Sequence, residues 1–109
     1  MADDLEARMA TLRRRFRNRL GERLSDMDTA LSEAAGPAGE EALREVVRHA
    51  HSLAGAAASF GMPEAGEAAA RLEQHVEGML RDGNASRPEG RARAAALLGE
   101  LRACASEER

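Results

Sequence analysis

The sequence predicts an all-α protein, and three observations support this prediction. Alanine and leucine, both strong helix formers, supply most of the apolar residues, while aromatic residues make up only 2% and β-branched residues are scarce. Apolar residues recur at every third or fourth position, as they do on one face of a helix. Short segments rich in glycine and proline interrupt this pattern, so we expect several helices joined by tight turns.

The first periodic stretch spans residues 3–35 and raises a question of length. Its apolar positions are Leu5, Met9, Leu12, Phe16, Leu20, Leu24, Met27, Leu31 and Ala34. One unbroken helix would be roughly 50 Å long, against about 30 Å for each later helix, and its first turns would project beyond the others. We therefore expect a kink near Gly21, with an additional N-terminal helical segment folded over the bundle end. The alternative is that this segment pairs with a partner.

The second helix is predicted over residues 40–60, after a break at 36–39. Its apolar stripe consists of Leu43, Val46, Val47, Ala50, Leu53, Ala54 and Ala57. We expect it to end at Phe60, with Gly61 as a left-handed cap. Pro63 then suits the first turn of a third helix.

The third and fourth helices are separated by a polar turn at residues 81–88. Their predicted core residues are Ala65, Ala69, Leu72, Val76 and Met79, and then Ala94, Leu97, Leu98, Leu101 and Ala105. Short turns make consecutive helices antiparallel. The sequence therefore predicts an up-down-up-down four-helix bundle, forming one domain over residues 1–109.

Composition limits the cellular locations and the classes of partner that fit this protein. The net charge of −3 provides no general attraction to nucleic acids or anionic membranes. Cys104 is the only cysteine, so no internal disulfide can form, and we interpret it as a small apolar residue of the last helix. The acidic N-terminus does not resemble a signal peptide. We expect a monomeric, soluble, cytoplasmic protein, and the exclusive use of arginine as the basic residue suggests a bacterial source.

His51 stands out on the second helix because of its position and its neighbour. On a helical wheel it lies roughly 90° from the centre of the apolar stripe, half supported by the core and half open. One turn further along the same face is Gly55, although a glycine inside a helix costs roughly 1 kcal/mol relative to alanine. We interpret Gly55 as removing bulk so that another protein can approach the imidazole. The alternative is that Gly55 relieves a helix–helix contact and that His51 is an ordinary boundary residue.

The segment around His51 resembles the motif of the histidine phosphotransfer (HPt) domain family. That motif reads His-x-Leu-Lys-Gly, with a helix-ending glycine ten residues after the histidine. The matching residues are His51, Ser52, Leu53, Gly55 and Gly61, with Leu72 and Glu73 similar to the family pattern on the next helix. The resemblance covers roughly residues 41–75. Ala54 departs from it, because the family usually has a lysine there whose charge favours the phosphorylated imidazole; Arg48 could supply a cation instead.

The resemblance implies a phosphoryl carrier with His51 as the phosphoacceptor. Such a domain receives the phosphoryl group from the aspartate of a response-regulator receiver domain and passes it to another receiver; a hybrid sensor histidine kinase is a further candidate partner. The receiver brings the Mg²⁺, so we expect no cofactor in this chain. The chain has no P-loop or ATP lid, and Ser52 stands where histidine kinases usually have an acidic residue, so we expect no kinase activity.

The receiver is expected to dock around His51, on Arg44, Arg48, Gly55, Ala58 and Ser59. The arginines suit the acidic rim of a receiver pocket through charge complementarity.

The sequence raises three other possible functions. His49 and His51 lie about 200° apart around a helix, so they cannot bind one metal ion, and no metal site is expected. The arginines of residues 13–19 spread around their helix with Phe16 pointing inward, which favours a solvated face over a nucleic-acid stripe. An adaptor bundle that docks partners on its faces, or on the stripe of Leu5, Met9 and Leu12, remains the alternative.

Overall fold

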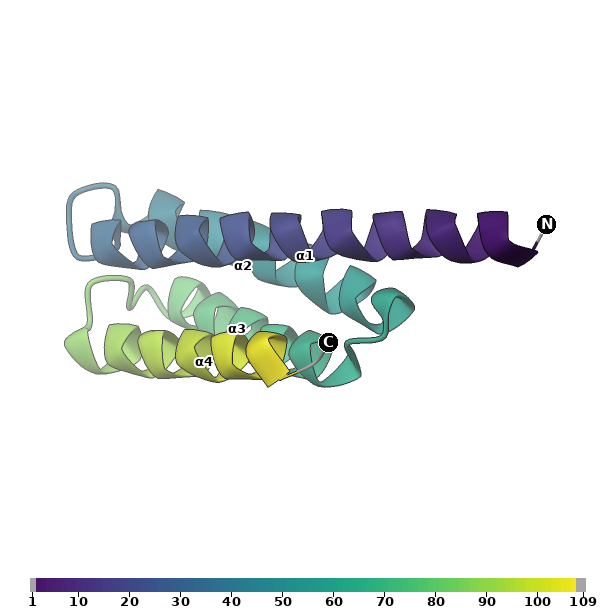
Figure 1. Cartoon of the computed structure of the whole chain (residues 1–109). Helices are drawn as coiled ribbons and strands as arrows, with labels where there is room; N and C mark the ends of the chain where they lie inside the picture. The colour runs from purple at the N-terminus through teal and green to yellow at the C-terminus, as the bar shows by residue number, and fades with distance from the viewer. Residues whose placement is uncertain (1, 108–109) are drawn as a thin grey trace.

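The computed structural model describes residues 2–107 and contains four α-helices (Figure 1). Helix α1 spans Ala2–Glu33, α2 spans Gly39–Ala56, α3 spans Pro63–Arg81 and α4 spans Pro88–Glu107; a short 3₁₀ helix, η1, covers Ala57–Phe60. The described residues contain no strand, which confirms the predicted all-α class. None of the described helices is long and apolar enough to cross a membrane.

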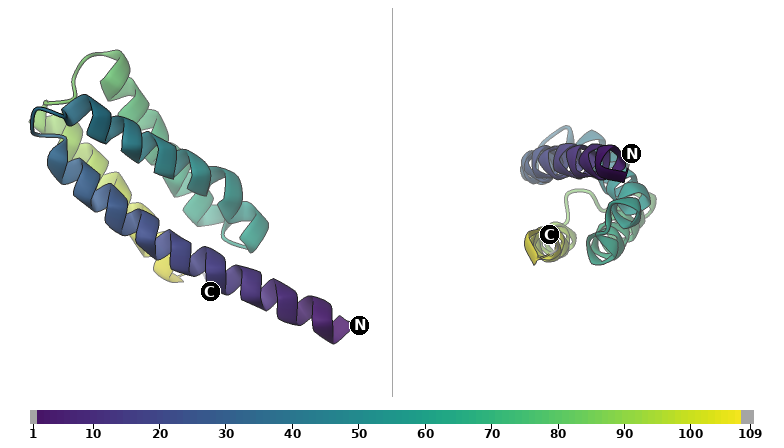
Figure 2. Two further views of the ribbon diagram at one scale, coloured as in Figure 1. Left: turned by 90° about the horizontal axis from the view of Figure 1, so that it is seen from above. Right: turned by 45° about the vertical axis from the view of Figure 1, so that its right-hand side comes forward.

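The four helices surround a common core. Helix α2 packs against α1 and α3, and α4 packs against α3 and α1, so each helix has two neighbours (Figure 2, right). The largest fully buried side chains are Met27, Leu43, Met62, Leu72, Leu98, Leu101, Val46 and Val76. The predicted stripes of the last three helices face this core; Val47, Ala54 and Ala105 are only partly buried. The four-helix bundle is therefore confirmed.

The turn between α2 and α3 sets the register of these two helices. The α-helical part of α2 ends at Ala56, earlier than the predicted Phe60, because the last turn tightens into η1. Gly61 then adopts a left-handed conformation with φ of 77°, as expected for a glycine cap. Its N–H donates to the Ala58 carbonyl at 3.2 Å, while the Met62 N–H donates to the Ala57 carbonyl at 2.9 Å. This Schellman pattern reverses the chain and lets Pro63 begin α3.

The predicted kink near Gly21 is wrong. Helix α1 continues through Gly21, and its N-terminal turns project past the ends of the other helices (Figures 1 and 2). Leu20 and Leu24 are buried on either side of Gly21, so the same face of one helix meets the core throughout. A glycine costs only roughly 1 kcal/mol relative to alanine in a helix and removes no backbone hydrogen bond, so it does not by itself break the helix.

Phe16 is the first residue of α1 whose described side chain is buried in the bundle. Its ring stacks on that of Phe60, with centroids 4.6 Å apart and an interplanar angle of 13°. Among the described side chains before Phe16, none is buried; Leu5 is 61% exposed and Leu12 is 43% exposed. The segment of residues 2–15, here called the α1 extension, therefore carries an uncovered apolar stripe.

Candidate functional site

His51 projects into solvent from the C-terminal half of α2. Its side chain is 77% exposed, which is more open than the half-supported position predicted from the helical wheel. The residues before and after it along the core face, Ala50 and Leu53, are buried. The core therefore anchors the backbone at this point, while the imidazole stays accessible to a partner.

One nitrogen of the His51 ring is held by a carboxylate from the neighbouring helix. Nδ1 lies 2.8 Å from Oε2 of Glu73 on α3. An ionised carboxylate only accepts hydrogen bonds, so Nδ1 carries the hydrogen and donates it. The neutral ring then has its lone pair on Nε2. Within residues 2–107 no side chain or backbone group bonds to Nε2, so this nitrogen is open to an incoming group.

Glu73 owes its position to the hairpin of α2 and α3. His51 and Glu73 lie at equal distances in sequence from Met62 in the turn, and in an antiparallel pair such residues come to the same level. The neighbouring Leu72 is fully buried, and the Glu73 side chain is only 16% exposed. Sequence reasoning noted Glu73 only as part of a family pattern; counting outward from Met62 in the turn would have pointed to this contact.

The other two histidines are committed to the fold. His49 is 19% exposed and faces α1, where its Nδ1 accepts from the Arg23 guanidinium at 3.2 Å. Its Nε2 lies 3.8 Å from a carboxylate oxygen of Glu45. The donor role of arginine places the hydrogen of the neutral His49 ring on Nε2. Both ring nitrogens of His49 therefore face a side chain of the protein, in contrast to Nε2 of His51.

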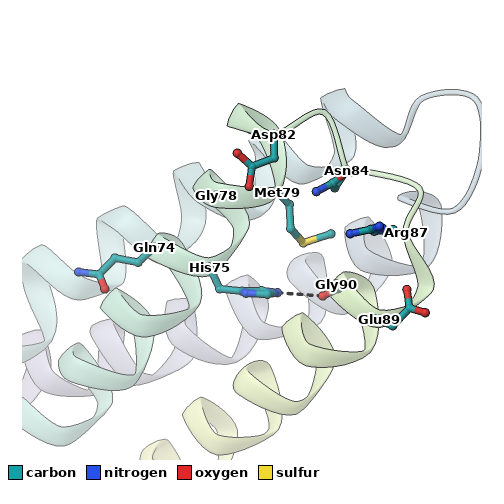
Figure 3. A pocket seen from close by; sticks show the side chains of 9 residues that line it. All are labelled: Gln74, His75, Gly78, Met79, Asp82, Asn84, Arg87, Glu89 and Gly90. Carbon is teal, nitrogen blue, oxygen red and sulfur yellow. Dashed lines mark hydrogen bonds between the residues drawn. The ribbon is translucent and has the colours of Figure 1, made fainter.

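His75 joins α3 to α4 beside a cavity of about 380 Å³ at the α3–α4 turn (Figure 3). Its Nε2 donates to the Gly90 carbonyl at 2.9 Å. The cavity is lined by Gln74, His75, Gly78, Met79, Asp82, Asn84, Arg87, Glu89 and Gly90. His51 is not among its lining residues. His75 therefore acts as an interhelical link.

Gly55 faces open space one turn beyond His51. A Cβ atom built there would meet no heavy atom within 4 Å outside the local backbone. Gly66 on α3 differs, because a Cβ there would lie 3.3 Å from the Cβ of Ala57. The alternative that Gly55 relieves a helix–helix contact is therefore wrong. Free space beside the imidazole is what the access interpretation requires.

The expected docking residues are all exposed along α2 and η1. They are Arg44, Arg48, Gly55, Ala58 and Ser59. Both arginines already form ion pairs on their own helix. Arg44 lies 3.5 Å from carboxylate oxygens of Glu40 and Glu41, and Arg48 lies 3.7 Å from Glu41. Arg48 is thus paired with Glu41. We expected Arg48 to supply the cation that the family's lysine provides at the position of Ala54. Among the described residues no contact between Arg48 and the imidazole supports this role.

A shallow groove that sequence reasoning missed lies beside these arginines. It has a volume of about 480 Å³ and is lined by Arg44, Val47, Arg48, Glu77, Leu80 and Arg81. Partly buried Val47 and Leu80 provide its apolar lining, one from each helix. Val47 is one turn before His51, and Glu77 is one turn after Glu73, so the groove adjoins the His51–Glu73 pair. No sequence signal on α2 alone could identify the contribution of α3.

No side-chain cluster suited to a metal ion occurs in the described part of the chain. The absence of such a cluster does not bear on Mg²⁺ bound by a partner.

The fold and the site define a class of protein: a four-helix bundle that presents one exposed histidine beside a carboxylate. A sequence model of the Hpt domain matches residues 11–107 of the 109 residues, so the chain belongs to the Hpt domain family. The expected family membership is confirmed. Members of this family take part in histidine phosphotransfer in phosphorelays. Neither the curated proteins nor the solved structures gave a significant match to the chain.

Proposed function

We propose that this protein is a phosphorelay intermediate. His51 accepts a phosphoryl group from the aspartate of one receiver domain and passes it to the aspartate of another. The observation that supports this most directly is the open Nε2 on an exposed ring whose Nδ1 donates to Glu73 at 2.8 Å. Glu73 orients the ring and selects the tautomer in which the solvent-facing nitrogen is the nucleophile.

The transfer step balances without a proton moving. The Nε2 lone pair attacks the phosphorus of the receiver's aspartyl phosphate, the N–P bond forms, and the P–O bond to the aspartate breaks. The aspartate leaves as a carboxylate. The His51 ring becomes an imidazolium with hydrogen on Nδ1 and the phosphoryl group on Nε2, and its positive charge lies beside the Glu73 carboxylate. The reverse attack by a second receiver's aspartate restores the neutral ring.

The chain supplies positioning, and the receiver supplies the rest of the chemistry. Catalysis of phosphoryl transfer depends mainly on alignment and neutralisation of charge. Mg²⁺ and an acidic pocket are contributed by the receiver domain, as the family resemblance implies. On this proposal the protein is a carrier without kinase activity of its own.

The receiver docks over the C-terminal half of α2 and the adjoining face of α3. Gly55, Ala58 and Ser59 present little side-chain bulk near the imidazole, which lets a partner surface approach closely. The Val47–Leu80 groove offers apolar contact area, and Arg44, Arg48 and Arg81 surround it with positive charge. This combination suits a partner with an apolar contact surface and an acidic rim.

Phosphotransfer from a panel of labelled receiver domains tests the proposal. The wild-type chain should gain acid-labile label from at least one receiver and lose it to an unlabelled second receiver. His51→Gln should gain none, while His49→Gln and His75→Gln remain competent. If no receiver labels the chain, or if His51→Gln is labelled as well as wild type, the proposal fails. Receiver binding without labelling would instead indicate an adaptor.

A further inference from the structure

The α1 extension carries a second surface that is unrelated to His51. Leu5, Met9, Leu12 and Phe16 follow one face of α1, because their spacings of four and three residues keep them within roughly 60° of one another. Phe16 is covered by Phe60, whereas Leu5 and Leu12 are 61% and 43% exposed. The extension is about 20 Å long, and an isolated helix of this length is marginally stable in water.

Charge is distributed unevenly along the α1 extension. The first turn is acidic, with Asp3 and Asp4, and Glu6 follows. Arginines occupy positions 13, 14, 15, 17 and 19, near the point where α1 enters the bundle. Within the described residues, none of these acidic side chains forms an ion pair. The acidic end and the basic end are therefore both available to a partner.

We propose that two copies of this chain associate through their α1 extensions, arranged antiparallel with the apolar stripes face to face. Glu6 and Arg13 lie on one flank of the stripe, and Asp4 and Arg15 lie on the other. In an antiparallel pair each flank meets the same flank of the second copy. In one register Glu6 lies opposite Arg13 of the second copy. The same register places Asp4 opposite Arg15 of the second copy. Each flank thus places acid against arginine twice, and the like-charge contact of this arrangement is that of Arg8 with Arg8 of the second copy, near the centre of the Asp4 flank.

A parallel pair lacks these acid–arginine contacts, because it sets the acidic ends together and Arg8 against Arg13 of the second copy. Like charges at such positions are unfavourable, so charge selects the antiparallel arrangement.

The dimer is expected to be weak. Three apolar side chains from each copy form its centre, and such a contact is smaller than the roughly 1,200–2,000 Å² of a standard stable interface. We expect a dissociation constant of about 10 μM to 1 mM. This proposal differs from the monomer that the sequence predicts. It agrees with the alternative given for the N-terminal segment, that it pairs with a partner.

Sedimentation velocity of the full chain, at concentrations up to on the order of 1 mM, tests the association itself. Wild type should shift reversibly from monomer to dimer as concentration rises. Leu5→Glu combined with Leu12→Glu should raise the dissociation constant at least about tenfold. Glu6→Arg and Arg13→Glu should each weaken the dimer, and the double variant should restore it. Circular dichroism verifies that every variant keeps its helicity.

Disulfide crosslinking in a Cys104→Ala background tests the orientation. Met9 lies near the centre of the antiparallel pair, so Met9→Cys should crosslink to itself on mild oxidation. The two copies of Leu5→Cys would be about 13 Å apart along the axis and should not crosslink. Equal crosslinking of both variants would indicate a parallel pair and overturn the arrangement. A monomer at every concentration would overturn the association and leave the stripe to a different partner.

Discussion

His49 and His51 are two residues apart on α2, and their surroundings are opposite. His49 points toward α1, is 19% exposed, and has a partner near each ring nitrogen, Arg23 and Glu45. His51 points away from α1, is 77% exposed, and uses only Nδ1, which donates to Glu73. Both side chains are imidazoles. The difference between a structural histidine and an available nucleophile therefore comes from the side of α2 on which each one lies.

The largest expected effect comes from exchanging these histidines one at a time. His51→Gln should abolish acid-labile labelling by a phosphorylated receiver, at least about a hundredfold below wild type, because the reacting nitrogen is gone. Its thermal stability should stay within about 0.5 kcal/mol of wild type, since the side chain is exposed. Labelling assays and thermal denaturation on the same samples measure both.

The matched change at His49 should have the opposite outcome. His49→Ala removes the acceptor of the part-buried Arg23 contact, so we expect a loss of about 1 kcal/mol in unfolding free energy with labelling preserved. Loss of labelling in a folded His49→Ala variant would contradict the division of roles between the two flanks.

Replacing Glu73 tests the contact that distinguishes His51 from His49, because it removes the group that orients the His51 ring. Glu73→Ala removes both the acceptor and the charge, and we expect labelling to slow by about 10- to 100-fold, the equivalent of one charge-assisted hydrogen bond. Glu73→Gln can keep an oxygen acceptor but lacks the charge that stabilises the imidazolium, so its rate should lie between. Stopped reactions at several receiver concentrations separate slower chemistry from weaker binding. Equal rates in all three proteins would remove Glu73 from the mechanism.

Gly55 tests the free space on the His51 side. Since a Cβ there meets nothing within 4 Å, Gly55→Ala should preserve stability or raise it by up to roughly 1 kcal/mol. Labelling should fall as side-chain volume increases from Ala to Leu. Gly99 on α4 is equally unobstructed, so Gly99→Leu is the control that should leave labelling unchanged.

The stability measurement has its own control at Gly66. Gly66→Ala would place a Cβ 3.3 Å from Ala57, so it should be less favourable than Gly55→Ala. A large destabilisation by Gly55→Ala would mean that this glycine serves the fold, and the access interpretation would be withdrawn.

The smallest effect is expected from the charges beside the groove. Labelling should slow as salt rises, because exposed charges are screened within roughly 8 Å at physiological ionic strength. Arg44→Ala and Arg48→Ala should each slow it a few-fold at most, since both arginines already pair with Glu41. Glu41→Gln, which frees Arg48 and leaves Arg44 paired with Glu40 alone, should change the rate in the opposite direction. Rates independent of salt and of all three substitutions would exclude these arginines from docking.

Local sequence by itself determined most of the helical layout. The apolar period of three and four residues selected the core faces, and Gly61 with Pro63 marked the turn between α2 and α3. These signals are short-range properties of the backbone and side chains, so they can be recognised without a partner helix. The segment from His51 to Gly61 likewise supplied the resemblance to the family that the Hpt match confirms.

Only the tertiary structure decided which groups meet across helices. The contact between His51 and Glu73, and the groove shared by Val47 and Leu80, depend on how α2 and α3 pack after the turn, which no period within one helix specifies. Packing between helices also determined that α1 continues straight through Gly21. A glycine lowers helix propensity without requiring a bend, so burial of Leu20 and Leu24 against the bundle, rather than the residue between them, kept the helix straight and left the α1 extension uncovered.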